Sequence, residues 1–201
     1  MVKQQIDERK LDILKELANI GFGNAVTSLS QMLHEEKISM DVPSAELVYL
    51  QDVPELLGGA ELPVAGVYIE SHGGADLTIL FVLSLDSSTN LILTLVPGLA
   101  GLNDQMGISV LIEVGNIMTN SYLNALSFMT GLLLIPSPPE IAVDMSGAII
   151  STVIAEKCVL EDEVVLIKTT LKSMQKSIEG HILILPDNRA LNTIFTLLGI
   201  R

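Results

Sequence analysis

Polar side chains recur along one narrow stripe of the segment from Ser109 to Ser127. A helix turns by about 100° per residue, so these side chains fall within about 80° of its circumference and hydrophobic residues fill the rest. The stripe consists of Ser109, Glu113, Asn116, Asn120, Asn124 and Ser127. The pattern predicts a helix from about Gln105 to Thr130 that is mostly buried and has one face in water.

The same stripe occurs 97 residues earlier, within a second helix predicted from Gln5 to about Leu33. Its members are Asp12, Glu16, Asn19, Gly23, Thr27 and Ser30. Gly21 and Gly23 interrupt this helix, and a glycine inside a helix is about 1 kcal/mol less favourable than an alanine. The pair therefore indicates either the close approach of another backbone or a kink.

The elements after each long helix follow a common order. The first half continues with a strand at 38–49, a helical turn at 52–57, two strands at 62–70 and 77–83 joined as a hairpin, and a helix at 86–96. The second half has a proline-rich turn, a strand at 140–144, a helix at 146–156, strands at 159–171 and 178–185, and a helix at 187–198. Asp86 and Asp187 are predicted N-caps, and Pro43 restricts its strand to a sheet edge or a bulge.

The chain is therefore interpreted as an internal duplication, with repeats at about 5–100 and 102–200 of one domain that spans residues 1–201. Gly98 and Gly199 follow the closing helices at an offset of 101 residues. Two α-β-β-β-α halves predict an α/β fold of the α+β type. We expect a pseudo-two-fold, mostly antiparallel sheet with the two long helices packed on one face.

Composition limits the function more than the fold. Hydrophobic residues make up 49% of the 201 residues, and 24 acidic against 11 basic residues give a net charge of −13, which disfavours a nucleic-acid partner. The single cysteine, Cys158, fits a reducing cytoplasm. The start of the chain lacks the hydrophobic core of a signal peptide, and prolines, glycines or polar residues break the uncharged runs. We therefore expect a cytoplasmic protein without membrane insertion.

Each stripe places a glutamate and an asparagine side by side, at Glu16 and Asn19 and again at Glu113 and Asn116. A carboxylate can pair with a cation, and a carboxamide can both donate and accept hydrogen bonds, as the orientation of a water molecule requires. A solvated helix face, symmetric capping or hydrogen bonds between helices would also explain such a pattern.

The two motifs resemble a family signature. Asp12-x3-Glu16-x2-Asn19 and Ser109-x3-Glu113-x2-Asn116, each followed by a proline, are similar to the [Asp/Ser]-x3-Glu-x2-Asn-x22-Pro pattern of the CheC, CheX and FliY family of chemotaxis phosphatases. The second copy has 22 residues between Asn116 and Pro139, whereas the first has 23 between Asn19 and Pro43. The duplication and the length resemble the CheC members more than CheX or FliY.

The resemblance implies a hydrolase that removes the aspartyl phosphate from the response regulator CheY in chemotactic two-component signalling. The glutamates of the two motifs would dock the regulator, and the asparagines would orient the attacking water. The implied catalytic residues are Glu16, Asn19, Glu113 and Asn116, with Asp12 and Ser109 in supporting roles. The chain would bind no cofactor, because the resemblance places Mg²⁺ on the regulator. Gly21 and Gly23 would let the regulator's backbone come close.

The CheC members that the chain resembles also bind the receptor deamidase CheD. The segment from Pro138 to Ile149 resembles the region that does so, and Asp144 would be the contact residue. Alternatively, Asp144 or Ser146 caps the following helix.

Two other interpretations remain open. In a non-catalytic adaptor the same helix faces would bind CheY or CheD without hydrolysis, and a structural role at a flagellar switch is a third possibility. We expect no metal site, since His34, His72 and His181 lie far apart and lack the spacing of a metal motif.

Overall fold

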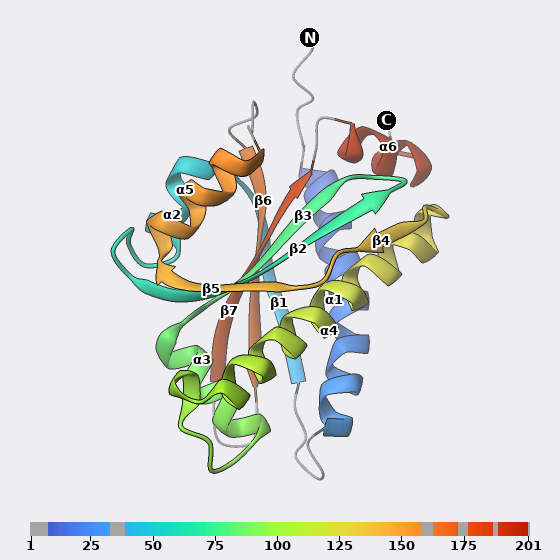
Figure 1. The fold of residues 1–201 in the computed structure, drawn as a ribbon. Coiled ribbons are helices and arrows are strands. Elements are labelled where there is room, and N and C mark those ends of the chain that lie inside the picture. Colours follow the sequence, from blue (N-terminus) through green and yellow to red (C-terminus); the bar gives the residue numbers. More distant parts are fainter. Residues whose placement is uncertain (1–7, 33–38, 158–162, 173–176, 187–188, 201) are drawn as a thin grey trace.

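The computed structural model describes residues 8–32, 39–157, 163–172, 177–186 and 189–200 (Figure 1). Within these ranges the helices are α1 (Glu8–Met32), α2 (Val53–Leu56), α3 (Leu85–Leu95), α4 (Gln105–Thr130), α5 (Ser146–Lys157) and α6 (Ala190–Leu197). The strands are β1 (Ser39–Tyr49), β2 (Pro63–Gly73), β3 (Leu77–Ser84), β4 (Leu134–Pro136), β5 (Glu140–Met145), β6 (Glu163–Lys172) and β7 (Ser177–Pro186). Both long helices lie where the polar stripes predict them.

The two halves of the chain build one sheet by exchanging strands. Its order is β1-β6-β7-β3-β2-β4, with β5 also paired to β2, and the strand pairs are antiparallel. The first strand of each half pairs with the hairpin of the other half, since β1 joins β6 and β5 joins β2. Neither half could therefore complete its part of the sheet alone.

A pseudo-two-fold axis passes through the middle of the sheet, where the equivalent strands β3 and β7 pair with each other. The offset of 101 residues between the closing helices makes Phe81 equivalent to Ile182, and these two residues are partners in the register. The fold class predicted from the sequence is confirmed.

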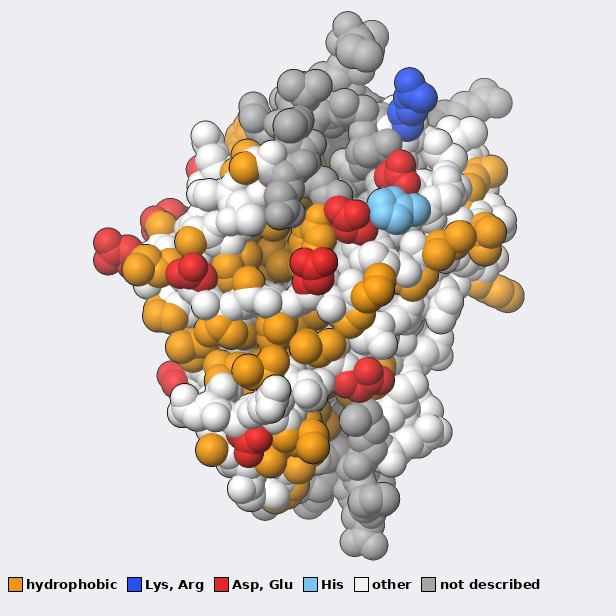
Figure 2. Space-filling model, viewed as in Figure 1, with side chains coloured by type: hydrophobic (Ala, Val, Ile, Leu, Met, Phe, Trp, Pro, Cys, Tyr) orange, Lys and Arg blue, Asp and Glu red, His pale blue; other side chains and the backbone are white. Residues whose placement is uncertain are grey.

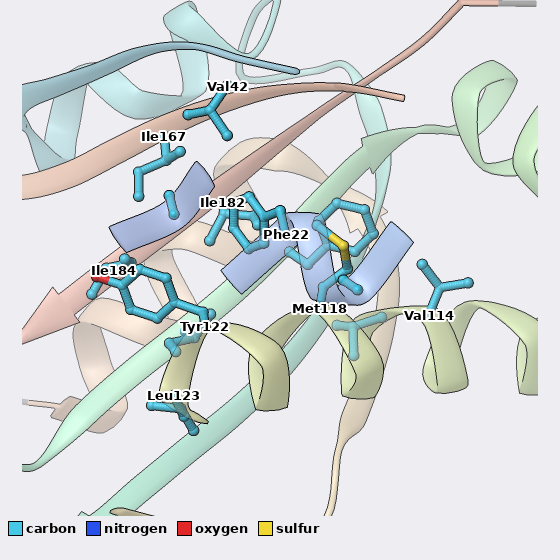
Figure 3. Packing of buried hydrophobic residues seen from close by; sticks show 14 of the residues in the cluster. Phe22, Val42, Val114, Met118, Tyr122, Leu123, Ile167, Ile182 and Ile184 are labelled. Atoms are coloured by element: carbon cyan, nitrogen blue, oxygen red, sulfur yellow. The ribbon is translucent and has the colours of Figure 1, made fainter. Parts of the chain in front are cut away.

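The long helices α1 and α4 cover one face of the sheet and cross each other (Figure 1). Figure 3 shows Phe22 of α1 beside Met118 and Tyr122 of α4, close to Ile182 and Ile184 of β7. These side chains are at most 3% exposed, and burial of each of the four apolar ones, Phe22, Met118, Ile182 and Ile184, contributes about 1.5–3 kcal/mol. Helices α2 and α5 cover part of the other face with a second hydrophobic cluster. No helix in the described ranges is both long and apolar enough to span a membrane.

The crossing of α1 and α4 depends on Gly21. A Cβ atom at this position would lie 2.8 Å from the Cα atom of Tyr122 and 2.9 Å from the carbonyl oxygen of Ser121. The close backbone approach predicted for Gly21 is thus confirmed, although the approaching backbone belongs to α4. The prediction was wrong for Gly23, where an added Cβ atom would meet no atom within 4 Å.

Pro43 and Pro139, the prolines of the two motifs, each lie where the strand pairing contains one extra residue. The pairing of β1 with β6 shifts between Asp41 and Ser44, so β1 carries an extra residue there, as expected of a bulge at Pro43. In the second half an extra residue separates β4 from β5 opposite β2, directly before Glu140. This interruption divides the second copy into two short strands, and β4 occupies part of the predicted proline-rich turn.

The caps of the closing helices differ from the prediction. Helix α3 begins at Leu85, and its N-cap is Ser84, whose Oγ atom accepts a hydrogen bond of 3.1 Å from the backbone N–H of Ser87. The expected cap, Asp86, lies in the first turn of the helix instead. The other expected cap, Asp187, lies outside the described residues.

Candidate functional site

The polar stripe of α4 faces solvent. Ser109 and Glu113 are exposed, and Asn116 and Asn120 are half-buried. Most of the rest of the helix surface, including Met118, is packed into the core shown in Figure 3. The prediction of a mostly buried helix with one wet face is therefore confirmed.

The stripe of α1 also faces solvent, and its side chains are more exposed than those of the α4 stripe. Asp12, Glu16, Asn19 and Gly23 are all exposed, whereas Leu17 and its buried neighbours face the core. Helix α1 thus presents its glutamate and asparagine to solvent in the same order along the helix as α4 does.

Each Glu-x2-Asn pair brings together two different chemical groups. Side chains three residues apart on a helix have Cβ atoms about 5–6 Å apart, so the carboxylate and the carboxamide can contact one bound molecule. Glu113 and Asn116 lie about two turns before the crossing of the helices at Tyr122, whereas Glu16 and Asn19 lie about one turn before Gly21. The chain therefore carries two candidate sites of similar composition, one on each long helix.

The carboxamide of Asn116 is held by the next polar residue of the stripe. The Nδ2 atom of Asn120 donates one hydrogen bond of 2.9 Å to the backbone oxygen of Asn116 and another of 2.7 Å to its Oδ1 atom. The sequence analysis placed Asn120 on the stripe but gave it no role. The signal was its position four residues after Asn116, a spacing at which amide side chains can pair.

The first site lacks this arrangement. The residue equivalent to Asn120 is Gly23, which has no side chain, and within the described residues the Asn19 carboxamide has no hydrogen-bond partner. The Asn19 side chain is exposed, and Gly23 offers it no amide four residues later. The two sites share their chemistry but differ in how firmly the asparagine is oriented.

The glycines predicted to admit a regulator's backbone have different surroundings. Gly21 is buried against α4, so it is not available to a partner, and that part of the expectation was wrong. Gly23 is exposed on the stripe and leaves open space above α1.

Asp144 lies on β5, well apart from the two stripes in the sequence and on the other face of the sheet. Its Oδ1 atom accepts a hydrogen bond of 2.7 Å from the backbone N–H of Met145, which precedes α5. Ser146 is buried, and its hydroxyl donates to the carbonyl oxygen of Gly59 at 2.7 Å, which ties α5 to the turn after α2. Neither contact is the predicted cap of α5.

A hollow of about 170 Å³ opens beside Asp144. Its apolar lining includes Leu80, Ala148 and Ile149, and Glu140 and Asp144 contribute carboxylates. Figure 2 shows this face of the molecule, where hydrophobic side chains follow β4 and β5 and acidic side chains lie among them. The arrangement suits a partner that has both apolar and basic groups.

Within the described ranges, no three His, Cys, Asp or Glu side chains gather closely enough to hold a metal ion. His72 lies at the end of β2, with its ring nitrogens 3.3 Å from Glu70 and 3.5 Å from Asp76. His34 and Cys158 lie outside the described residues. The expectation that the chain binds no metal or cofactor stays a prediction.

Two titratable groups outside the stripes, the half-buried His181 and the buried Tyr122, have shifted pKa values. Burial lowers the pKa of His181, the positive charge of Lys168 lowers it further, and the negative charge of Glu179 raises it. Burial also raises the pKa of Tyr122 above its ordinary value. Neither group belongs to the polar stripes, so these shifts concern stability rather than the candidate sites.

The fold and the paired stripes define a class of protein: an internally duplicated antiparallel sheet that carries two long helices, each with an exposed Glu-x2-Asn pair. A sequence model described as the CheC-like family matches residues 10–47 and 106–143, which contain both pairs. The CheY-P phosphatase CheC of Bacillus subtilis (strain 168) is 33% identical over 201 residues, with 96% of each chain covered. This chain therefore belongs to the CheC-like family, which functions in chemotaxis.

Solved structures show the same fold at lower identity. FliY from Thermotoga maritima superposes with a TM-score of 0.76 at 17% identity and covers 99% of this chain and 98% of its own. A chain of the FliG-FliM complex from H. pylori has a TM-score of 0.67 at 11% identity, with 95% and 100% covered. At these identities the similarity concerns the fold alone.

Proposed function

We propose that this protein is a phosphatase that hydrolyses the aspartyl phosphate of the response regulator CheY. The observation that carries the proposal is the repeated pairing of an exposed glutamate with an asparagine one turn later, on two helices whose other faces are buried. The relative that is 33% identical over nearly the whole chain is described as a CheY-P phosphatase, and this supports the choice of substrate.

The reaction requires a water molecule in line with the bond that breaks. The water oxygen forms a bond to phosphorus while the bond from phosphorus to the aspartate oxygen breaks, which yields inorganic phosphate and a free carboxylate. Phosphoryl transfer depends mainly on positioning and on stabilisation of charge. The carboxamides of Asn19 and Asn116 would accept a hydrogen bond from this water through Oδ1 and could donate to a phosphoryl oxygen through Nδ2.

The glutamates would hold the regulator in place. Glu16 and Glu113 are exposed and can pair with a cationic side chain of the partner, such as a lysine near its phosphorylated aspartate. The Mg²⁺ that neutralises phosphoryl charge would belong to the regulator. Asp12 and Ser109 would have supporting roles; the hydroxyl of Ser109 donates to the backbone oxygen of Gln105 at 3.1 Å.

The test is the decay of phosphorylated CheY from the same organism, measured in the presence of Mg²⁺. We expect the wild-type protein to accelerate the decay, Asn19→Ala and Asn116→Ala each to reduce this effect, and the double variant to abolish it. Thermal unfolding of each variant checks that the fold is retained. A double variant as active as the wild type would contradict the roles given to the asparagines.

A non-catalytic adaptor is the second candidate function. The observation that favours it is the fold shared with a chain of the FliG-FliM complex, in which two proteins bind each other. The same decay measurement separates the two functions, because an adaptor would bind the regulator without changing the lifetime of its phosphate. In that case the asparagine substitutions would alter binding at most.

We also propose that CheD binds beside Asp144. The hollow next to this residue combines an apolar lining with two carboxylates and lies away from both stripes, so CheD and CheY could bind together. Asp144→Asn should weaken CheD binding measured by calorimetry, whereas Asp52→Asn, at another exposed acid, should not. Unchanged affinity for Asp144→Asn would exclude this contact.

A further inference from the structure

We propose that Asn120 is a positioning residue that presets the orientation of the Asn116 carboxamide, and that its absence makes the first site the slower one. This inference rests on the proposed phosphatase function. It assigns the difference between the two sites to one residue, Asn120 in α4 against Gly23 in α1.

The hydrogen bonds identify which end of the Asn116 side chain is held. The backbone oxygen of Asn116 can only accept, so the group that approaches it at 2.9 Å must be the amide nitrogen of Asn120. The second hydrogen of this nitrogen is directed to Oδ1 of Asn116 at 2.7 Å. The carboxamide of Asn116 is therefore fixed with its oxygen toward Asn120 and its own Nδ2 atom turned away.

This orientation leaves the groups that hydrolysis would use available. The Oδ1 atom of Asn116 has a second lone pair that can accept from the attacking water, and Nδ2 keeps both hydrogens for a phosphoryl oxygen. A side chain that already has its reactive rotamer loses less conformational freedom when the partner binds. Asn120 and Asn116 are both half-buried, which favours a persistent hydrogen bond between them.

Among the described residues, the first site has none that could position its asparagine in the same way. Asn19 is exposed, and Gly23 at the equivalent position provides no donor. An added Cβ atom at Gly23 would meet no atom within 4 Å, and Gly23 lies inside α1, so an asparagine fits there without displacing a neighbour. The positioning contact can therefore be removed from one site and introduced into the other.

The first experiment removes the hydrogen bond that Asn120 donates to the Asn116 carboxamide. In an Asn19→Ala background only the second site can act on phosphorylated CheY. In that background kcat and KM are measured for two variants, Asn120→Ala and the isosteric Asn120→Asp, which lacks the amide donor. We expect kcat to fall about three- to tenfold for both variants, as for the loss of one hydrogen bond, and Asn120→Ala to leave KM unchanged. In an Asn116→Ala background, Asn120→Ala should have no further effect, because it acts through Asn116.

The second experiment introduces the equivalent hydrogen-bond donor into the first site, at position 23. In an Asn116→Ala background, Gly23→Asn should raise the rate of the first site several-fold, whereas the matched control Gly23→Ala should not. The control makes the same backbone change without supplying an amide. Thermal unfolding shows whether each variant is folded.

The outcomes separate this inference from the proposed function. If Asn116→Ala slows hydrolysis but Asn120→Ala and Asn120→Asp do not, the positioning role is wrong and the phosphatase stands. An equal loss from Asn120→Ala with and without Asn116 would show a merely structural role and overturn the inference. If the variant that lacks both Asn19 and Asn116 keeps the wild-type rate, the proposed function itself fails.

Discussion

The two copies of the polar stripe carry the same pair of glutamate and asparagine side chains, but in the part of the chain that the structure describes only the copy in α4 has a neighbour that hydrogen-bonds to the asparagine. Both helices keep a glutamate and an asparagine at the same spacing on their solvent-facing side, with Asn19 exposed and Asn116 half-buried. In α4, Asn120 bonds to Asn116, but in α1 the equivalent position is Gly23. The duplicated stripes thus share a carboxylate and a carboxamide, while the side-chain amide that bonds to the carboxamide is present in only one copy.

The buried sides of the same helices differ for another reason. At their crossing α1 contributes the small residues Gly21 and Ala25, whereas the equivalent residues of α4 are the large Met118 and Tyr122. Two backbones can approach closely only when one of them lacks a side chain at the contact. At this crossing the two equivalent surfaces are therefore complementary, with small residues on α1 facing large ones on α4.

The largest expected effect concerns the asparagines. In an Asn19→Ala background, Asn116→Ala should lower the hydrolysis rate of phosphorylated CheY by about 100-fold, as the loss of one well-placed hydrogen-bonding group does in other active sites. Asn19→Ala alone should reduce the total rate less than Asn116→Ala alone, because the second site has the oriented carboxamide. Equal losses from the two single variants would remove the functional difference between the copies.

The helix crossing gives the next largest effect. Gly21→Ala should lower the free energy of unfolding by about 1–3 kcal/mol, because its Cβ atom would press on the backbone of α4. The control is Gly23→Ala two residues later, which meets open space and should raise stability by about 0.5–1 kcal/mol. Urea unfolding measures both variants, and effects of the same sign would contradict the contrast.

The smallest expected effect concerns a difference between the two central strands, β3 and β7. At the offset of 101 residues, the first copy has buried Leu80 where the second has half-buried His181. Since the pKa of His181 is lowered in the folded state, the unfolded chain takes up a proton first as the pH falls below about 6.5. The native protein is therefore favoured above that pH and loses stability below it, by at most about 1.4 kcal/mol per pH unit.

His181→Leu should make the free energy of unfolding less dependent on pH between about 7 and 5, as measured by urea unfolding at several pH values. His181→Gln is the control that removes the titration but keeps a polar side chain. An unchanged slope in both variants would show that His181 does not contribute to the pH dependence.

The sequence by itself determined the features that depend on residues close together in the chain. The position of Glu113 and Asn116 on one exposed face follows from helical periodicity, and the duplication follows from the repeat of that pattern after 97 residues. The hairpin of β2 and β3 was likewise predicted from two hydrophobic runs and the turn between them. The bond from Asn120 to Asn116 was accessible in principle, but the spacing alone does not reveal which atoms meet.

Only the tertiary structure decided which surfaces meet across the molecule. The exchange of β1 and β5 between the halves, the contact of Gly21 with α4 and the strand β4 depend on residues far apart in sequence. Hydrophobic periodicity tells which face of an element is buried, but many partners of the same polarity could cover it. The choice among them depends on the close packing of complementary shapes, which exists only once the whole chain is folded.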